Sequence, residues 1–124
     1  MAVSISELIG KKDEIKAKKK NLYAFETSLG EFVFRVPSTE IISDAFELKS
    51  SLETNAYVIY ECAVNPNLKD KELQKAYNCF EPTEIVNALF QTGEISRIAD
   101  ALFVLAGYTK NKLAYKLYEE IKNC

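Results

Sequence analysis

The 124-residue chain contains no histidine and no tryptophan, and only three cysteines, three prolines and four glycines. Histidine is the commonest general base and the usual partner of serine and cysteine nucleophiles, so its absence disfavours most hydrolytic mechanisms. The usual zinc sites are excluded too, because Cys62, Cys79 and Cys124 lie far apart and form no CxxC pair. The glycine patterns that cradle phosphates are also missing. We therefore expect no enzyme, no metal site and no cofactor.

Long apolar runs are missing as well, and no segment approaches the roughly 20 residues that span a bilayer. The first apolar residues are followed at once by Gly10 and lysines, which is not typical of a signal peptide. A net charge of −2 disfavours a general nucleic-acid binder. With 48% hydrophobic and 27% charged residues, the composition is typical of a globular protein. We expect a cytoplasmic protein with no small-molecule substrate, nucleic acid or membrane as partner.

Residues 1–21 are expected to form an N-terminal arm, helical in part or flexible. Ser4 and Glu7 have the spacing of a capping box, and an apolar stripe follows, made of Ile5, Leu8 and Ile9. Residues 11–20 then hold six lysines and two acids. Such a run is typical of a basic arm for nucleic acid or anionic lipid, or of a solvated linker or frayed helix. The second interpretation is favoured, because no aromatic residue or arginine interleaves with the lysines.

Residues 22–36 have the pattern of a β-hairpin. Hydrophobic and polar side chains alternate on both strands, with glycine available for a turn at Leu29-Gly30, and Pro37 ends the second strand. One side of the first strand carries Tyr23, Phe25 and Thr27, and one side of the second carries Phe32, Phe34 and Val36. Two strands alone are marginal in water, so these sides must pack on the helices that follow.

The rest of the chain has the periodicity of short helices. A helix is expected from Ser38 to about Lys49, then a soft loop over residues 50–55. Residues 56–64 fit helix or strand, and a buried helix ended by Pro66 is favoured. Four further helices are expected, with start or stop signals at Asp70, Pro82, Thr92, Gly107 and Thr109. We predict a mainly α (α+β) protein, a compact bundle of short helices with one N-terminal hairpin, in a single domain over residues 22–124.

Two features of the sequence are candidate functional sites, and for both of them a structural role is favoured. Glu40 with Asp44, and Glu81 with Glu84, could pair on helices, but acids near a helix start usually complement its dipole. The three capped helices between residues 70 and 107 could form a DNA-reading helix-turn-helix. Its recognition helix would expose Glu94, Ser96, Arg97 and Asp100, and acids repel phosphates.

Exposed tyrosines are as typical of the edge of a core as of protein contacts.

The order of breaks and caps in the second half resembles the XkdN-like phage tail assembly chaperones. The matching features are Asn65-Pro66-Asn67-Leu68 with Asp70 and Leu73, the helix at Pro82, and Gly93-Glu94 leading a helix that ends at Gly107. The hairpin followed by Glu40 is also similar to the family's N-terminal half. The resemblance covers most of residues 22–108 and leaves out the last expected helix.

This resemblance implies an assembly chaperone of a phage, a defective prophage or a tail-like particle, acting in the host bacterial cytoplasm. Such proteins are thought to bind the long, helical tape measure protein and to keep it soluble during assembly of the tail tube. The family also implies possible partners in the chain itself and in a longer, frameshifted form. Apolar stripes at the two chain ends are the candidate partner-binding residues: Ile5, Leu8, Ile9, Leu113, Leu117 and Ile121. The alternative from a different class is a small helical DNA-binding regulator.

Overall fold

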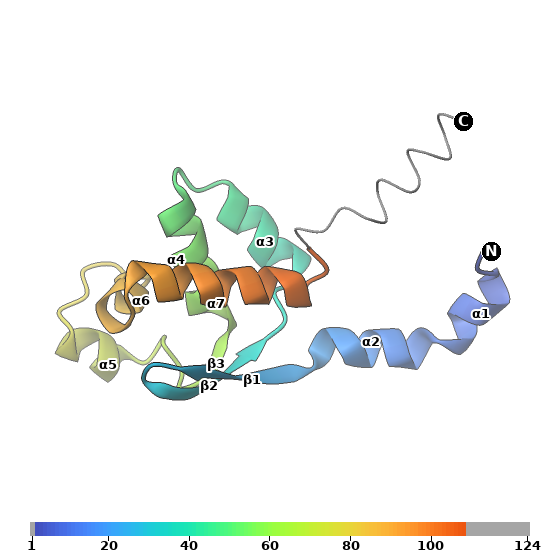
Figure 1. The fold of residues 1–124 in the computed structure, drawn as a ribbon, viewed down its shortest axis with the longest axis horizontal. Helices are drawn as coiled ribbons and strands as arrows, with labels where there is room; N and C mark the ends of the chain where they lie inside the picture. Colours follow the sequence, from blue (N-terminus) through green and yellow to red (C-terminus); the bar gives the residue numbers. More distant parts are fainter. Residues whose placement is uncertain (1, 109–124) are drawn as a thin grey trace.

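The computed structural model describes residues 2–108, in which three strands and seven helices follow one another (Figure 1). The strands are β1 (Leu22–Thr27), β2 (Gly30–Arg35) and β3 (Ala63–Asn65). The helices are α1 (Ile5–Gly10), α2 (Lys12–Lys20), α3 (Thr39–Phe46), α4 (Ser51–Cys62), α5 (Lys71–Ala76), α6 (Glu84–Leu89) and α7 (Thr92–Leu105). The architecture is mainly α with a small antiparallel sheet, and the predicted mainly α (α+β) class is confirmed. The helix expected from Thr109 onward lies outside the described residues.

Helices α1 and α2 extend from one end of the body as an arm (Figure 1). Ser4 is the N-cap of α1, because its hydroxyl accepts a hydrogen bond from the Glu7 backbone N–H at 3.1 Å, while the Glu7 carboxylate accepts from the Ser4 hydroxyl at 3.3 Å. The lysine-rich run forms α2, and neither helix of the arm contains a buried residue. The arm therefore takes no part in the hydrophobic core.

The predicted hairpin is present, but it is two-thirds of a three-stranded sheet in the order β1-β2-β3. The expectation of one hairpin alone is wrong, because Phe34 of β2 pairs with Ala63 of β3. Residue 65 precedes a proline, which favours extended backbone, and the pairing satisfies an edge of β2 that would otherwise be open. The chain after α4 thus adds a short strand instead of one more helical turn.

Helix α4 begins earlier than predicted. The expected loop over residues 50–55 is wrong, since Ser50 is an N-cap whose side chain accepts from the Glu53 N–H at 3.2 Å. Thr54 lies inside the helix and donates its hydroxyl to the Ala45 carbonyl at 2.9 Å, which ties α4 to the end of α3. The preference for a buried helix is correct as far as Cys62. Helix α3, in turn, ends at Phe46 and not at Lys49.

Of helices α5, α6 and α7, only α5 begins with a side-chain cap. Asp70 accepts from the Leu73 N–H at 2.9 Å, as predicted, while α6 begins at Glu84 and not at Pro82. The reason is a tight turn in which the Ile85 N–H donates to the Pro82 carbonyl at 3.3 Å. Helix α7 begins at Thr92 and stops before Gly107, whose φ of +100° is in the region that favours glycine.

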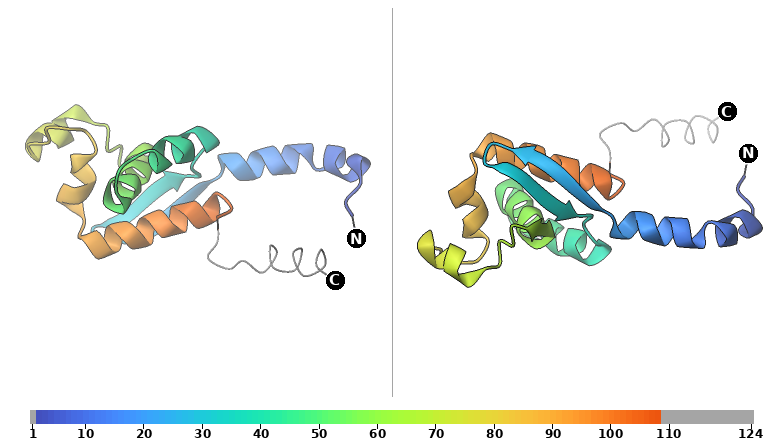
Figure 2. Two further views of the ribbon diagram at one scale, coloured as in Figure 1. Left: turned by 90° about the horizontal axis from the view of Figure 1, so that it is seen from above. Right: turned by 90° about the horizontal axis from the view of Figure 1, so that it is seen from below.

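The sheet forms one layer, and the helices of the body, without the arm, cover a single face of it (Figure 2). Along β1 and β2 the side chains alternate between the helix side, where Phe32 and Phe34 are buried, and the open side. Helices α4 and α7 pack on each other over this face. The largest fully buried side chains are Phe34, Ile59, Leu68, Ile85, Ile95 and Leu102. This core fixes the positions of the sheet and the helices that carry the candidate surfaces of the body.

Candidate functional site

The first predicted stripe lies fully on the outside of the molecule. Ile5 is 77% exposed, Leu8 51% and Ile9 69%, and all three belong to α1 of the arm. Leaving three large aliphatic side chains in water on one short helix has a free-energy cost that a partner would remove. The second predicted stripe, at Leu113, Leu117 and Ile121, lies outside the described residues. The structure therefore locates only the first of the two stripes.

A cluster of three aromatic rings on the body is the surface that sequence reasoning missed. Phe46 from the end of α3 stacks on Phe103 of α7, with ring centroids 5.6 Å apart. Tyr108 meets both rings edge-on, at 6.2 Å from Phe46 and 6.1 Å from Phe103. Phe46 is 58% exposed and Tyr108 is about half exposed, so the cluster faces solvent. We call these three residues the aromatic cluster.

The end of α7 is built to hold Tyr108 in this cluster. The Tyr108 N–H donates to the Phe103 carbonyl at 2.9 Å, and the Gly107 N–H donates to the Val104 carbonyl at 3.0 Å. These two bonds are the Schellman motif, which is commonly accompanied by a side-chain contact between the same two end residues. The contact here is the Phe103–Tyr108 ring pair. The glycine stop predicted from the sequence therefore also fixes an exposed aromatic side chain.

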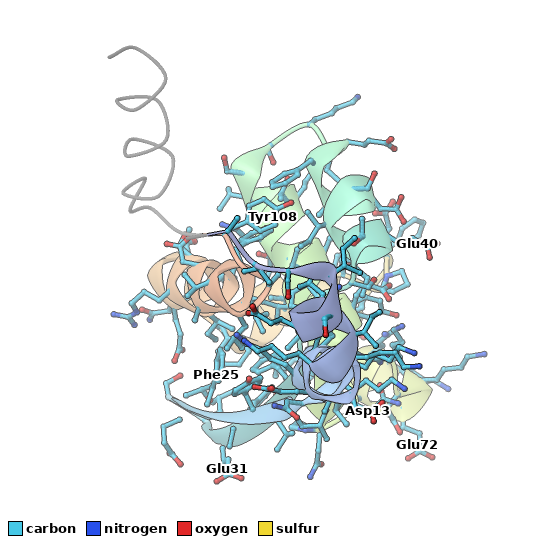
Figure 3. All side chains as sticks on the ribbon, turned by 90° about the vertical axis from the view of Figure 1, so that its right-hand side faces the viewer. Asp13, Phe25, Glu31, Glu40, Glu72 and Tyr108 are labelled. Atoms are coloured by element: carbon cyan, nitrogen blue, oxygen red, sulfur yellow. The ribbon has the colours of Figure 1, made fainter. Side chains whose placement is uncertain are left out.

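A hollow of about 730 Å³ lies between the base of the arm and the aromatic cluster. Its wall includes apolar groups from the sheet side, α3 and α7, and two cations from α2: Tyr23, Ile42, Val104, Tyr108, Lys18 and Lys19. Val104 is 56% exposed and extends the apolar surface along α7. Figure 3, seen along the arm, places Tyr108 on the side of the body above α2. The combination of aromatic wall and lysine rim fits an amphipathic segment with acidic flanks.

The sequence contains signals for the residues of this surface, but these signals predict another placement for them. Phe46 and Phe103 each fall on the apolar stripe of a helix, and this periodicity alone predicts an inward-facing side chain. Both lie near the end of a helix, where the body no longer covers them, and the packing of α3 and α7 on the same helix α4 brings them together. Tyr108 is one of several tyrosines beside helices, and its residue type is as typical of the edge of a core as of a protein contact.

A second, smaller hollow of about 380 Å³ lies beside the start of α7 and is lined in part by Phe25, Glu94 and Arg97. Glu94 is engaged with the hairpin turn, accepting from the Ser28 backbone N–H at 2.8 Å and from its hydroxyl at 2.6 Å. These hydrogen bonds lower the pKa of the Glu94 carboxyl. The acid at the start of this helix therefore has a structural role.

Among the described residues, an acid and a cysteine that could act in catalysis have structural positions. Glu84 accepts from the Phe80 backbone N–H at 2.8 Å, so this acid organises the turn before α6. Burial raises the pKa of the Cys62 thiol to about 12, which disfavours the thiolate. Residues 2–108 contain no group of three or more acids or cysteines that could hold a metal ion. Every helix in this range is too short or too polar to cross a membrane.

Comparison with known proteins identifies the chain through its sequence. The family model for the phage XkdN-like tail assembly chaperone protein matches residues 47–122, which is more than half of the chain. The match begins after the hairpin and continues through the C-terminal segment, whereas the resemblance seen in the sequence covered residues 22–108. Neither the curated proteins nor the solved structures gave a match. The chain belongs to the XkdN-like family of phage tail assembly chaperones.

Proposed function

We propose that this chaperone binds the tape measure protein of its phage, prophage or tail-like particle and keeps it soluble in the host cytoplasm until the tail tube assembles. The observation that carries the proposal is the exposed aromatic cluster beside the lysine-rimmed hollow, in a member of the tail assembly chaperone family. A long helical client presents apolar stripes that aggregate unless they are covered. A surface of this kind can cover one stripe at a time.

Two separate surfaces would take part in binding. The first is the α1 stripe of Ile5, Leu8 and Ile9, at the tip of the arm. The second is the aromatic cluster with Val104. The residues Leu113, Leu117 and Ile121 remain predicted contacts, and they follow Tyr108 closely in the chain. Contacts of modest strength are an advantage here, because the client must be released when tube subunits replace the chaperone.

Affinity purification with the tape measure protein tests this proposal. Val104→Asp and Tyr108→Ser should reduce the amount of co-purified tape measure protein at least about tenfold, because a charge or a lost ring in an apolar contact costs more than about 1.4 kcal/mol. Phe80→Ser is the matched control, since Phe80 is 93% exposed on another part of the body. Equal recovery with all variants would show that the aromatic cluster is not the binding surface.

A DNA-binding test separates this function from the DNA-binding alternative. Duplex DNA should bind the chaperone weakly, if at all, and a strong affinity that falls steeply with salt would favour the regulator instead.

A further inference from the structure

Strand β1 forms an open edge of the sheet. Its strand partner among the described residues is β2, and the order of the sheet is β1-β2-β3. The outward N–H and C=O groups of an edge strand are a template on which a further strand can pair. The opposite edge is blunted, because β3 has three residues and is followed by Pro66. The six-residue β1 is therefore the edge that can accept another strand.

A groove runs between this edge and α7. Figure 2 shows α7 along the β1 side of the sheet, and the hollow of about 380 Å³ lies between the two elements. Phe25 of β1 and Ile98 and Ala101 of α7 supply its apolar wall. At one end, the hydrogen bonds between Ser28 and Glu94 fix the helix to the hairpin turn. We call this hollow with the outer side of β1 the edge groove. A strand added here would gain backbone hydrogen bonds from the edge and side-chain contacts from the helix.

Two acids lie directly opposite each other on the open side of the hairpin. Glu26 of β1 and Glu31 of β2 are cross-strand partners, and both side chains are exposed. Figure 3 shows Glu31 pointing away from the body. Like charges in this arrangement destabilise a sheet. Among the described residues neither acid forms an ion pair, and Arg35, the only cation in residues 22–35, is roughly 13 Å further along β2. A bound partner could supply the missing positive charge.

The two sides of β1 define an alternating pattern for an added strand. A residue opposite Glu26 would lie on the open side of the sheet, beside the two carboxylates. A residue opposite Phe25 would lie on the helix side, next to Ile98 and Ala101. The first position therefore favours lysine or arginine, and the second favours an aliphatic side chain.

The charges around the edge groove agree with this preference. Arg97 on the groove wall lies close to the Glu94 carboxylate, whose pKa is lowered first by the Ser28 hydrogen bonds and then by the charge of Arg97. The positive charge of Arg97 is thus partly compensated within the wall. Residues 21–108 contain six lysines and arginines and thirteen acids, a balance of −7. The body as a whole therefore attracts a basic segment.

We infer that the edge groove binds an extended basic segment of a partner protein, in which lysine or arginine alternates with aliphatic residues. Glu26 and Glu31 repel acidic segments, and they also repel the β1 edge of a second copy, which carries the same acids. The segment pairs as a strand, whereas the proposed client is helical. Its binding therefore goes beyond the proposed function and does not depend on it.

Fluorescence anisotropy with defined peptides and the full chain tests this inference. The probe is a labelled peptide of about eight residues, a usual strand length, in which lysine and valine alternate. One control alternates glutamate and valine, and a second has the composition of the probe but places all its lysines before all its valines. A third control is the probe with methylated backbone nitrogens, which cannot donate to a strand edge. The probe should bind at least about tenfold more tightly than each control, because only the probe combines the charge, the alternation and the N–H donors.

A charge inversion at the edge locates the site. Glu26→Lys should weaken binding of the probe at least about tenfold and make the glutamate–valine peptide the tighter ligand. Glu26→Gln removes the charge with little change in shape and should cause a smaller loss. Glu72→Lys on α5 changes the net charge by the same amount as Glu26→Lys, and it should keep the wild-type affinities. Circular dichroism verifies the fold of each variant.

Hydrogen exchange provides an independent readout of where the probe binds. The bound probe should slow the exchange of backbone amides in β1, while those of β3 and of the lysine-rich α2 keep their rates. Absence of probe binding, equal affinity for any control peptide, wild-type behaviour of both Glu26 variants, or protection confined to segments other than β1 would each overturn the inference. None of these results bears on the proposed function, which co-purification of the tape measure protein tests separately.

Discussion

Ser28 in the hairpin turn is bound by Glu94 at the start of α7 through two hydrogen bonds, at 2.8 Å from its backbone N–H and 2.6 Å from its hydroxyl. The two residues are 66 positions apart in the chain. This contact holds the tip of the sheet against the helix whose other end carries the aromatic cluster. It therefore links the hairpin to the element that shapes the candidate client surface.

Removal of this contact should loosen the hairpin without unfolding the body. Glu94→Gln and Ser28→Ala should each lower the thermal midpoint, and the double variant should fall by less than the sum, because both changes remove the same interaction. Differential scanning calorimetry of the four proteins measures this coupling. Strict additivity would show that the two residues contribute independently.

The same contact gives the stability a defined pH dependence. Because the pKa of Glu94 is lowered in the folded protein, its contribution is present above the unfolded value of about 4.3 and is lost as the pH falls through the folded value. Urea denaturation across this acidic range should show a smaller loss of stability for Glu94→Gln than for the wild type. Glu72→Gln on α5 removes another exposed carboxylate and should keep the wild-type slope. A Glu94→Gln slope equal to that of the wild type would contradict this assignment.

The aromatic residues of the core and surface should respond very differently to truncation. Phe34 is fully buried between the sheet and the helices, so Phe34→Ala should cost about 3–5 kcal/mol in the free energy of unfolding. Phe80 is 93% exposed, and Phe80→Ala should change that free energy by less than about 0.5 kcal/mol. Chemical denaturation of both variants checks the pair. A large cost at Phe80 would mean that its ring packs on something in solution.

Gly93 in the first turn of α7 and Gly107 just after its end should give effects of opposite sign. Gly107 has a φ of +100°, so Gly107→Ala should destabilise by about 1–2 kcal/mol and disturb the position of Tyr108. Gly93 lies in the first turn of the helix with no atom near a new Cβ, so Gly93→Ala should stabilise by about 0.4–1 kcal/mol. Thermal denaturation distinguishes the two. The Gly107 argument fails if both substitutions are neutral.

The cysteines should differ in reactivity. Burial raises the pKa of Cys62 to about 12, so its thiol should react with a disulfide reagent at neutral pH only after unfolding. Cys79 is less buried and should react sooner in the folded protein. Labelling followed by mass spectrometry of peptides gives both rates. Fast labelling of Cys62 in the native state would show that α4 opens readily.

Local signals in the sequence predicted most of the helices, because caps and stops act over three or four residues. Ser4, Asp70 and Gly107 each have the predicted role. The strand after α4 was missed because Ala63 pairs with Phe34, and such pairing over a long separation leaves no local pattern. The prediction of a loop over residues 50–55 is wrong, because the polar residues that suggested it stabilise a helix. Ser50 caps α4, and Thr54 within α4 donates a hydrogen bond to the end of α3.

The candidate site was predicted only in part for a similar reason. The exposure of the α1 stripe follows from the sequence, because a run of lysines comes directly after it. Lysines are rarely buried, so this run keeps the start of the chain outside the core. The aromatic cluster depends on how α3 crosses the end of α7, and the periodicity of each helix points Phe46 and Phe103 inward. Only the packed structure shows that both rings lie beyond the edge of the core.

The most direct test of the central claim is the soluble yield of the tape measure protein when it is produced with and without this chaperone in the same bacterial cell. Co-production with the wild-type chain should move the tape measure protein from the pellet to the soluble fraction. Val104→Asp should fail to do so while remaining folded and abundant itself. If the tape measure protein stays insoluble with the wild type, or is equally soluble without it, the proposed function is wrong.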